Sequence, residues 1–293
     1  MTLDSAFYDT LSRFRLAMGH KSSMNLTGNR KSAQKGSSTE FSDFREYMPG
    51  DDIRRIDWNA YGRLDRLYVK EYMEEKEAAV TILLDTSASM DYGARKKSEL
   101  ACMLAGAMAY LGLNNMDRVY LYDMKRMHSP FAASGGKRAL PRLNDWLSQC
   151  AFEGTTDVME AVRRLPAKGA GVTIIISDLW QESLLDGEQD TVQRLLRFLD
   201  YRRQKAVLLH VLAGEELAVE LTGTRNLIDM EDKSTLRLTL DAASIRVYED
   251  ALNAYMSRLK RECARTGAFY AVCNTETDFQ QLIFKELRIL YDI

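Results

Sequence analysis

Short apolar runs alternate along the chain with longer amphipathic stretches. The runs contain many β-branched residues and predict buried strands at residues 80–84, 119–122, 172–176, 206–212 and 269–273. Apolar residues three or four positions apart predict helices at residues 95–113, 140–150, 158–165, 190–203, 242–266 and 277–290. Strands that alternate with helices typically form a parallel sheet covered by helices on both faces. We therefore expect a doubly wound α/β fold.

Four segments depart from this alternation. Residues 225–230 and 235–240 flank Glu-Asp-Lys-Ser and predict a β-hairpin, inserted at about residues 221–240. Residues 67–72 alternate like an edge strand that leads into the strand at 80–84. Residues 129–137 contain Pro and two Gly and predict a loop. Residues 1–40 are basic and rich in Gly and Ser, as in a flexible arm. The predicted domains are residues 1–77 and 78–293.

Composition excludes several classes of protein. The chain has 293 residues, of which 46% are hydrophobic and 28% charged, as in an ordinary soluble protein. A net charge of −2 gives no general attraction to nucleic acid. No apolar run approaches the roughly 18–20 residues of a transmembrane span, and the N-terminus lacks a secretory signal pattern. Four cysteines without zinc-site spacing favour a reducing compartment, so we expect a cytoplasmic protein: Cys102, Cys150, Cys263 and Cys273.

Oxygen-bearing side chains follow the predicted strands where each one ends. Asp85, Ser87 and Ser89 follow the strand at 80–84, Thr156 precedes a helix, and Asp178 follows the strand at 172–176. In an open α/β sheet, ligands bind outside the carboxyl ends of the strands. Oxygen ligands without His or Cys suit Mg²⁺ best, with Mn²⁺ or Ca²⁺ as alternatives. The competing interpretation is that these residues only cap helices and stabilise turns.

A second candidate region, residues 43–63, combines alternating charges with aromatic residues. Its composition favours a network of Arg–Asp ion pairs held between aromatic planes over acid/base catalysis. Such a network serves as an internal brace or as a binding surface. Its candidate residues are Arg45, Asp51, Asp52, Arg54, Arg55, Asp57 and Trp58.

The oxygen ligands resemble the metal-ion-dependent adhesion site of von Willebrand factor A domains. The family pattern Asp-x-Ser-x-Ser matches residues 85–89, and its Thr and second Asp match Thr156 and Asp178. The resemblance implies that Ser87, Ser89 and Thr156 contact the metal directly. It also implies that Asp85 and Asp178 act largely through water. One departure from the pattern is that Leu follows Asp178, where the family usually has Gly.

A longer stretch resembles the bacterial family known as domain of unknown function 58. The resemblance lies in Lys35-Gly36 and in residues 40–47, 49–59, 69–71 and 85–90. Members of this family are often encoded beside MoxR-type AAA+ ATPases and are thought to act with them in protein or metal-cofactor maturation. The resemblance therefore implies a MoxR-type partner, which no individual residue of this chain indicates.

Three functions fit these observations. The first is a non-enzymatic, metal-dependent adaptor in which a partner protein supplies a carboxylate to the metal. The second is a Mg²⁺-dependent phosphoryl-transfer hydrolase. This alternative is weakened because Ser87 stands where the haloacid-dehalogenase pattern has its second Asp, and because no Gly-x-x-x-x-Gly-Lys-Ser/Thr loop is present. The third is a hydrogen-bonded cluster that holds no metal. We favour the adaptor.

Overall fold

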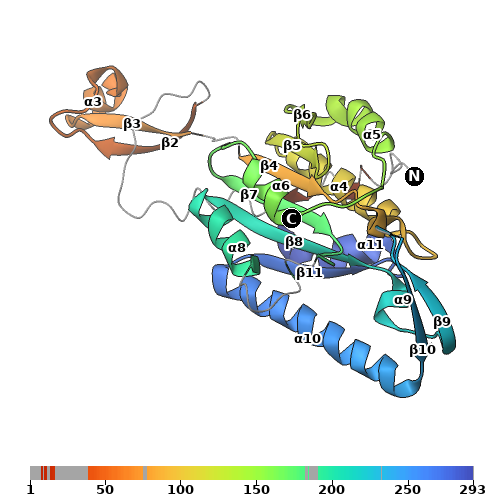
Figure 1. The fold of residues 1–293 in the computed structure, drawn as a ribbon. Helices are drawn as coiled ribbons and strands as arrows, with labels where there is room; N and C mark the ends of the chain where they lie inside the picture. The colour runs from red at the N-terminus through yellow and green to blue at the C-terminus, as the bar shows by residue number, and fades with distance from the viewer. Residues whose placement is uncertain are drawn as a thin grey trace. The chain divides into compact units, whose positions relative to one another are not determined.

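The computed structural model describes residues 8, 10, 11, 14–16, 39–74, 78–181, 184, 191–231 and 233–292 (Figure 1). The chain divides into two compact units. The larger contains Met1–Met24 and Ala78–Ile293, and the smaller contains Asn25–Glu77. Each unit is described separately below.

A six-stranded sheet forms the centre of the larger unit, in the order β11-β8-β7-β4-β5-β6. Its strands are parallel except β6, which runs antiparallel to β5. The fold is therefore mixed α/β with a largely parallel sheet, as the alternating pattern predicts. The strands are β4 (Ala79–Leu84), β5 (Arg118–Asp123), β6 (Phe131–Ala133), β7 (Gly171–Ser177), β8 (Gln204–Leu212) and β11 (Phe269–Asn274).

The strand register brings the carboxyl ends of the central strands level with one another. β4 is buried along its whole length, and its last residue, Leu84, pairs with Asp123 of β5 and Ile176 of β7. At the opposite end Ala79 pairs with Gly171, where an added Cβ would lie 2.1 Å from the Ala79 carbonyl oxygen. Glycine at this position permits the close approach of β7 to β4.

Helices cover both faces of the sheet, as predicted (Figure 1). Alternate residues of β4 divide between the two cores, with Ile82 in one and Leu83 in the other. The first core contains α4 (Lys97–Asn114) and α5 (Leu140–Ser148). The second contains α6 (Val158–Arg164), α8 (Thr191–Tyr201) and α10 (Ala242–Thr266).

The N-terminal residues that the structure describes pack within the larger unit. Tyr8 and Leu11 are buried in the first core, and the Tyr8 ring lies 4.8 Å from that of Tyr110. β1 (Arg15–Leu16) pairs with β12 (Tyr291–Asp292) near the end of the chain. The boundary between residues 77 and 78 stays a prediction. Residues 17–38, most of the predicted basic arm, lie outside the described residues.

The smaller unit is an antiparallel pair of strands, β2 (Thr39–Glu46) and β3 (Tyr68–Glu74). The 3-10 helix η1 (Ile53–Arg55) and the helix α3 (Trp58–Leu64) connect them. The prediction of a strand at 67–72 is confirmed. This strand precedes β4 in the chain, but it is not an edge of the central sheet, because β3 pairs with β2 in a separate two-stranded sheet.

Three further segments test the sequence predictions. The predicted loop at 129–137 contains β6, which adds an antiparallel edge strand to β5. The predicted closing helix is broken into α11 (Phe279–Gln281), a π-helix at Leu282–Glu286 and a 3-10 helix at Arg288–Leu290. The hairpin is confirmed as β9 (Gly223–Ile228) and β10 (Thr235–Leu240). No helix in the described ranges has the length and apolar character to span a membrane.

Candidate functional site

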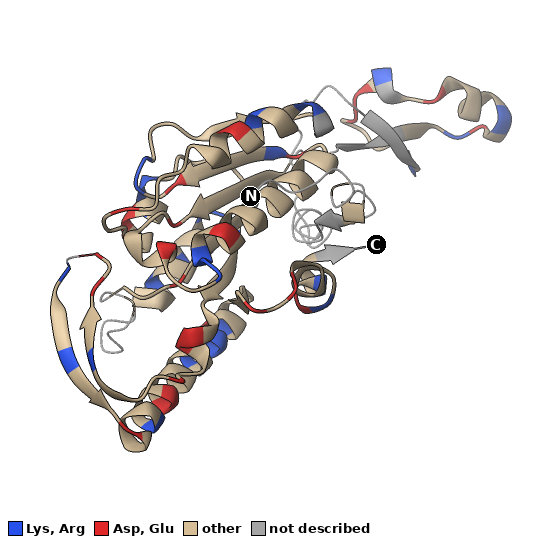
Figure 2. Ribbon diagram, turned by 90° about the vertical axis from the view of Figure 1, so that its right-hand side faces the viewer, with Lys and Arg blue, Asp and Glu red and all other residues tan. Residues whose placement is uncertain are grey.

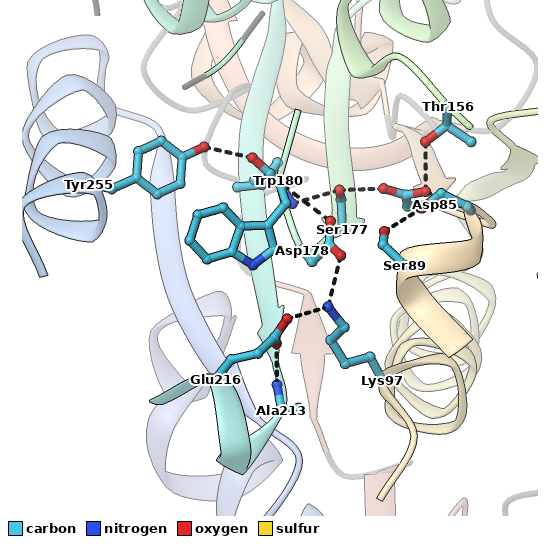
Figure 3. Close-up of polar contacts among 12 residues, drawn as sticks. Asp85, Ser89, Lys97, Thr156, Ser177, Asp178, Trp180, Ala213, Glu216 and Tyr255 are labelled. Atoms are coloured by element: carbon cyan, nitrogen blue, oxygen red, sulfur yellow. Dashed lines mark hydrogen bonds and ion pairs between the residues drawn. The ribbon is translucent and has the colours of Figure 1, made fainter. Parts of the chain in front are cut away.

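Asp85 lies at the centre of a hydrogen-bonded cluster beyond the carboxyl ends of β4 and β7 (Figure 3). Its side chain is fully buried. Oδ1 accepts hydrogen bonds from the Ser87 backbone at 2.9 Å and from the Thr156 hydroxyl at 2.7 Å. Oδ2 accepts one from the Ser177 hydroxyl at 2.5 Å. One carboxylate thus joins the loops that follow β4, precede α6 and end β7.

Two hydroxyls lie beside this carboxylate. Ser87 precedes the 3-10 helix η2 (Ala88–Asp91), and its Oγ lies 3.0 Å from that of Ser89. The backbone holds this loop against the next one, because the Ala88 N–H donates to the Gly154 carbonyl at 2.8 Å. Gly154 has a φ of +66°, which glycine adopts without strain. Two serine hydroxyls are therefore held together at the edge of the site.

Thr156 and its neighbours have distinct roles. The Thr156 hydroxyl donates to Asp85, whereas Thr155 is exposed. Asp157 caps α6 by accepting a hydrogen bond from the Glu160 backbone at 2.7 Å. The helix-capping alternative thus applies to Asp157, and the hydroxyl of Thr156 points instead into the cluster.

Asp178 pairs with a buried lysine. The Lys97 ammonium, from the first turn of α4, lies 2.8 Å from Asp178 Oδ2 and 2.8 Å from Glu216 Oε1 (Figure 3). Glu216 belongs to α9 (Gly214–Leu217), and its other oxygen accepts from the Ala213 backbone at 2.7 Å. Burial acts to lower the pKa of Lys97, but the charges of Asp178 and Glu216 outweigh it and the pKa is raised. This lysine is therefore charged.

The backbone after Asp178 adopts an unusual conformation. Leu179 is buried and has a φ of +55°, in the left-handed region that favours glycine. Its N–H donates to Ser177 Oγ at 2.9 Å, and its carbonyl accepts from the Tyr255 hydroxyl at 2.7 Å. The next residue, Trp180, stacks on the Tyr255 ring. The position where the adhesion-site pattern usually has Gly thus keeps a glycine-like backbone.

Negative charge exceeds positive charge around the cluster. Lys97 is the only buried Lys or Arg side chain in the described part of the chain, whereas Asp85 and Asp178 are both buried. Burial, followed by the charge of Asp178, raises the pKa of Asp85 against the effect of its hydrogen bonds. Burial also raises the pKa of Glu216, although Lys97 opposes this. A bound cation would offset this excess of negative charge, which suits the oxygen donors present.

The donor set is unlike that of a carboxylate- or histidine-rich metal centre. Within the described ranges no three His, Cys, Asp or Glu side chains are grouped as metal ligands. A cation at this site would therefore depend on the hydroxyls of Ser87, Ser89 and Thr156. Divalent magnesium accepts hydroxyl oxygens and keeps several waters, so the site fits it.

Sequence reasoning missed three polar partners in the cluster. Ser177 directly precedes Asp178 at the end of a strand, so its position beside the predicted ligands was a usable signal. Lys97 and Glu216 belong to no recognisable motif, and only the fold brings them to Asp178. The nearby His210 is buried in β8, and its Nδ1 lies 2.7 Å from the Tyr270 hydroxyl. Burial lowers the pKa of His210 to about 4, so it is uncharged.

The candidate residues of the smaller unit mainly stabilise its own turns. Arg45 pairs with Asp51 at 2.9 Å, and Asp51 also accepts from the Met48 backbone. Asp52 caps η1 through the Arg54 backbone, and Asp57 caps α3. The predicted aromatic sandwich differs from the structure, since Trp58 is 63% exposed and meets Tyr61 edge to face. The side chain of Arg55 lies outside the described residues.

Comparisons with known proteins give a family without an assigned activity. The family described as "Protein of unknown function DUF58" matches residues 43–258. The uncharacterized proteins Rv1480 of Mycobacterium tuberculosis and Mb1516 of Mycobacterium bovis are each 24% identical to the chain over 257 residues. These matches cover 83% of this chain and 77% of each relative.

Two solved structures from Bacteroides are also similar. One is the conserved hypothetical protein BatB from Bacteroides thetaiotaomicron, at 15% identity and a TM-score of 0.43. The other is described as an aerotolerance-related membrane protein from Bacteroides fragilis, at 14% identity and a TM-score of 0.42. Each match covers 73% of this chain and 98% of the other.

Proposed function

The chain belongs to the family described as protein of unknown function DUF58, and from that premise we propose that it is a non-enzymatic, metal-dependent protein-binding adaptor with a von Willebrand factor A-like site. The observation that carries this proposal is the convergence of three loops on Asp85, which joins Ser87 and Thr156 in one cluster. Their oxygens are the donor types that a magnesium ion prefers.

The residues have separate parts in this proposal. Ser87, Ser89 and Thr156 would hold the ion directly, while Asp85 and Asp178 act through bound water. Because the direct ligands are neutral hydroxyls, a bound magnesium ion would keep most of its charge and accept a carboxylate oxygen from a partner protein. Lys97 balances the charge of Asp178, and the bonds of Thr156 and Ser177 to Asp85 hold the loops in position.

A Mg²⁺-dependent phosphoryl-transfer hydrolase is the alternative. This reaction needs a general acid close to Asp85. The haloacid-dehalogenase pattern has an Asp two residues after the first, but this chain has Ser87 there, and the Ser87 hydroxyl lies 3.0 Å from that of Ser89. No structural observation favours this alternative over the adaptor. Metal-dependent turnover of a phosphate ester that is lost in Asp85→Ala would reverse the order of the two proposals.

The partner and location follow from the sequence expectations. We propose a MoxR-type AAA+ ATPase as the partner, because the family resemblance implies one. The cysteine pattern favours a cytoplasmic place of action.

The proposal is tested by affinity capture with the full chain in Mg²⁺ and in EDTA. Asp85→Asn removes the central charge at constant size, and Asp91→Asn is its control, since Asp91 pairs with Lys96 at the surface. We expect a partner to be retained by the wild type and Asp91→Asn only in Mg²⁺, and by Asp85→Asn in neither buffer. A partner that binds regardless of EDTA and of the Asp85 change would overturn the proposal.

A further inference from the structure

A cavity of about 140 Å³ lies on the face of the sheet that packs against the second core. Its sheet wall comes from the amino-terminal halves of β4, β7 and β8, through Thr81, Thr173 and Gln204. The Asp85 cluster lies beyond the opposite, carboxyl ends of β4 and β7, so the cavity is a separate site. An apolar cavity of about 150 Å³ binds benzene, so this one has room for a ligand of about that size.

Two buried hydroxyls in the cavity wall have no hydrogen-bond partner. Thr81 and Tyr122 both line the cavity and are each 3% exposed. Among the residues that the structure describes, neither hydroxyl makes a hydrogen bond, whereas the Thr173 hydroxyl donates to Gln204 Oε1 at 3.1 Å. Burial raises the pKa of Tyr122, so its hydroxyl stays protonated and able to donate. Buried hydroxyls of this kind are satisfied by water or by a ligand oxygen.

Two cations line the more exposed side of the cavity. Lys168 is exposed and Arg202 is half-buried. Arg202 Nη1 donates to the Leu165 carbonyl at 2.6 Å, and Lys168 Nζ lies 4.0 Å from the centroid of the Tyr120 ring. Neither cation forms an ion pair within the described part of the chain, and the described lining contains no Asp or Glu. Elsewhere, as along α10, Lys and Arg are interspersed with Asp and Glu (Figure 2). The cavity therefore favours an anion.

From this arrangement we propose that the cavity binds a small carboxylic acid that carries a second oxygen, as a hydroxy acid or an oxo acid does. Its carboxylate pairs with Arg202 and Lys168, because hydrogen bonds between ionised partners are the strong ones. Its second oxygen accepts hydrogen bonds from the hydroxyls of Thr81 and Tyr122. Its apolar body covers Leu165 and the rest of the apolar wall, which an inorganic phosphate would leave uncovered.

NMR spectroscopy of the full chain tests this proposal, with 4-hydroxybenzoate and 4-oxopentanoate as probes. We expect both acids, at millimolar concentration, to shift the backbone amides of Thr81, Thr173 and Gln204. Two control compounds should leave these amides unchanged. 4-Hydroxybenzyl alcohol lacks the carboxylate, and inorganic phosphate lacks the apolar body.

Substitutions in the wall assign the shifts to the cavity. Arg202→Gln removes a charged hydrogen-bond donor and should weaken binding of both acids about tenfold or more, whereas Arg197→Gln, at an exposed position of α8, should not. Tyr122→Phe removes a neutral donor and should weaken binding about fivefold, with Tyr201→Phe, at an 87% exposed position, as its control. Lys168→Gln repeats the test of charge at an exposed residue, where the substitution does not disturb folding.

Three results would overturn the proposal. The first is the absence of shifts at the lining amides with both acids, which would mean that water alone satisfies the two hydroxyls. The second is binding of the neutral alcohol or of phosphate as tightly as the acids. The third is an affinity for the acids that neither Arg202→Gln nor Lys168→Gln reduces.

Discussion

The ammonium nitrogen of Lys97 lies 2.8 Å from Oδ2 of Asp178, and the two side chains are only 1% and 2% exposed. An ion pair so far from water is retained only when both partners are well satisfied. Lys97 meets this condition with a second carboxylate, Glu216, at 2.8 Å. The pair links the first turn of α4 to the loop after β7, and so holds one wall of the candidate site in place.

Removing the lysine charge leaves two carboxylates without their partner. Breaking a buried pair from one side costs about 3–5 kcal/mol, because the remaining charge is buried and uncompensated. We therefore expect Lys97→Met to lower the free energy of unfolding by about 3–5 kcal/mol, as measured by urea denaturation.

The neighbouring residue provides the control for this change. Lys96 pairs with Asp91 at 2.8 Å, but both side chains are exposed, so Lys96→Met should cost less than about 1 kcal/mol. Equal and small effects of the two substitutions would show that Asp178 and Glu216 do not depend on Lys97.

The two adjacent threonines give a matched test of the second loop. Thr156→Val removes the hydroxyl that bonds Asp85 at nearly constant volume, and Thr155→Val makes the same change at an exposed position. We expect Thr156→Val to weaken Mg²⁺ binding about tenfold or more in calorimetry. Thr155→Val should leave the affinity unchanged. A larger effect at Thr155 would place the metal on the other side of the loop.

The left-handed residue after Asp178 depends on a tyrosine from α10. Tyr255→Phe keeps the ring that stacks on Trp180 but removes the hydroxyl that bonds the Leu179 carbonyl. We expect a loss of about 1 kcal/mol in unfolding free energy and faster hydrogen exchange at Leu179 and Trp180. Tyr201→Phe at an exposed site is the control. Unchanged exchange in Tyr255→Phe would mean that this bond does not hold the loop.

Hydrophobic periodicity predicted most of the larger unit because its central strands β4, β7 and β8 are buried on both faces. The run at 172–176 corresponds to β7, and the helix predicted at 242–266 has those bounds in α10. The pattern could not show which strand pairs with which. The alternation at 67–72 identified β3, but its pairing with β2 depends on residues far earlier in the chain. Three residues of β6 are too short a run to outweigh their Pro and Gly neighbours.

The residues of the candidate site also include some that the sequence predicted and others that only the fold brings together. Asp85, Thr156 and Asp178 were predictable because each follows a strand or precedes a helix at one edge of the sheet. Lys97 has the sequence pattern of an ordinary charged residue of an amphipathic helix, and only the fold brings it to the buried carboxylates of Asp178 and Glu216.

The hairpin joins α10 at a capping residue whose titration can be followed. Asp241 accepts a hydrogen bond from the Ser244 backbone at 2.8 Å, and this bond chiefly lowers the pKa of Asp241. Because the folded pKa lies below the unfolded value, the cap stabilises the helix above about pH 3.9 and is lost as pH falls through the folded pKa.

NMR titration of the Ser244 amide checks this expectation. Its chemical shift should change with a midpoint below about pH 3.9 in the wild type. It should stay constant in Asp241→Asn, because asparagine keeps a capping oxygen but does not titrate. A midpoint above that value would contradict the proposed cap.

The N-terminal residues provide a test of where the larger unit begins. Leu11 is fully buried in its first core although it lies far before β4. Truncating a buried leucine removes apolar contacts and leaves a cavity, so Leu11→Ala should lower the unfolding free energy by about 2–5 kcal/mol. Leu64→Ala, at a 61% exposed position of the smaller unit, should change it by less than about 0.5 kcal/mol. If Leu11→Ala is as mild as Leu64→Ala, residues 1–24 are an appendage and the independently folding unit begins near residue 78.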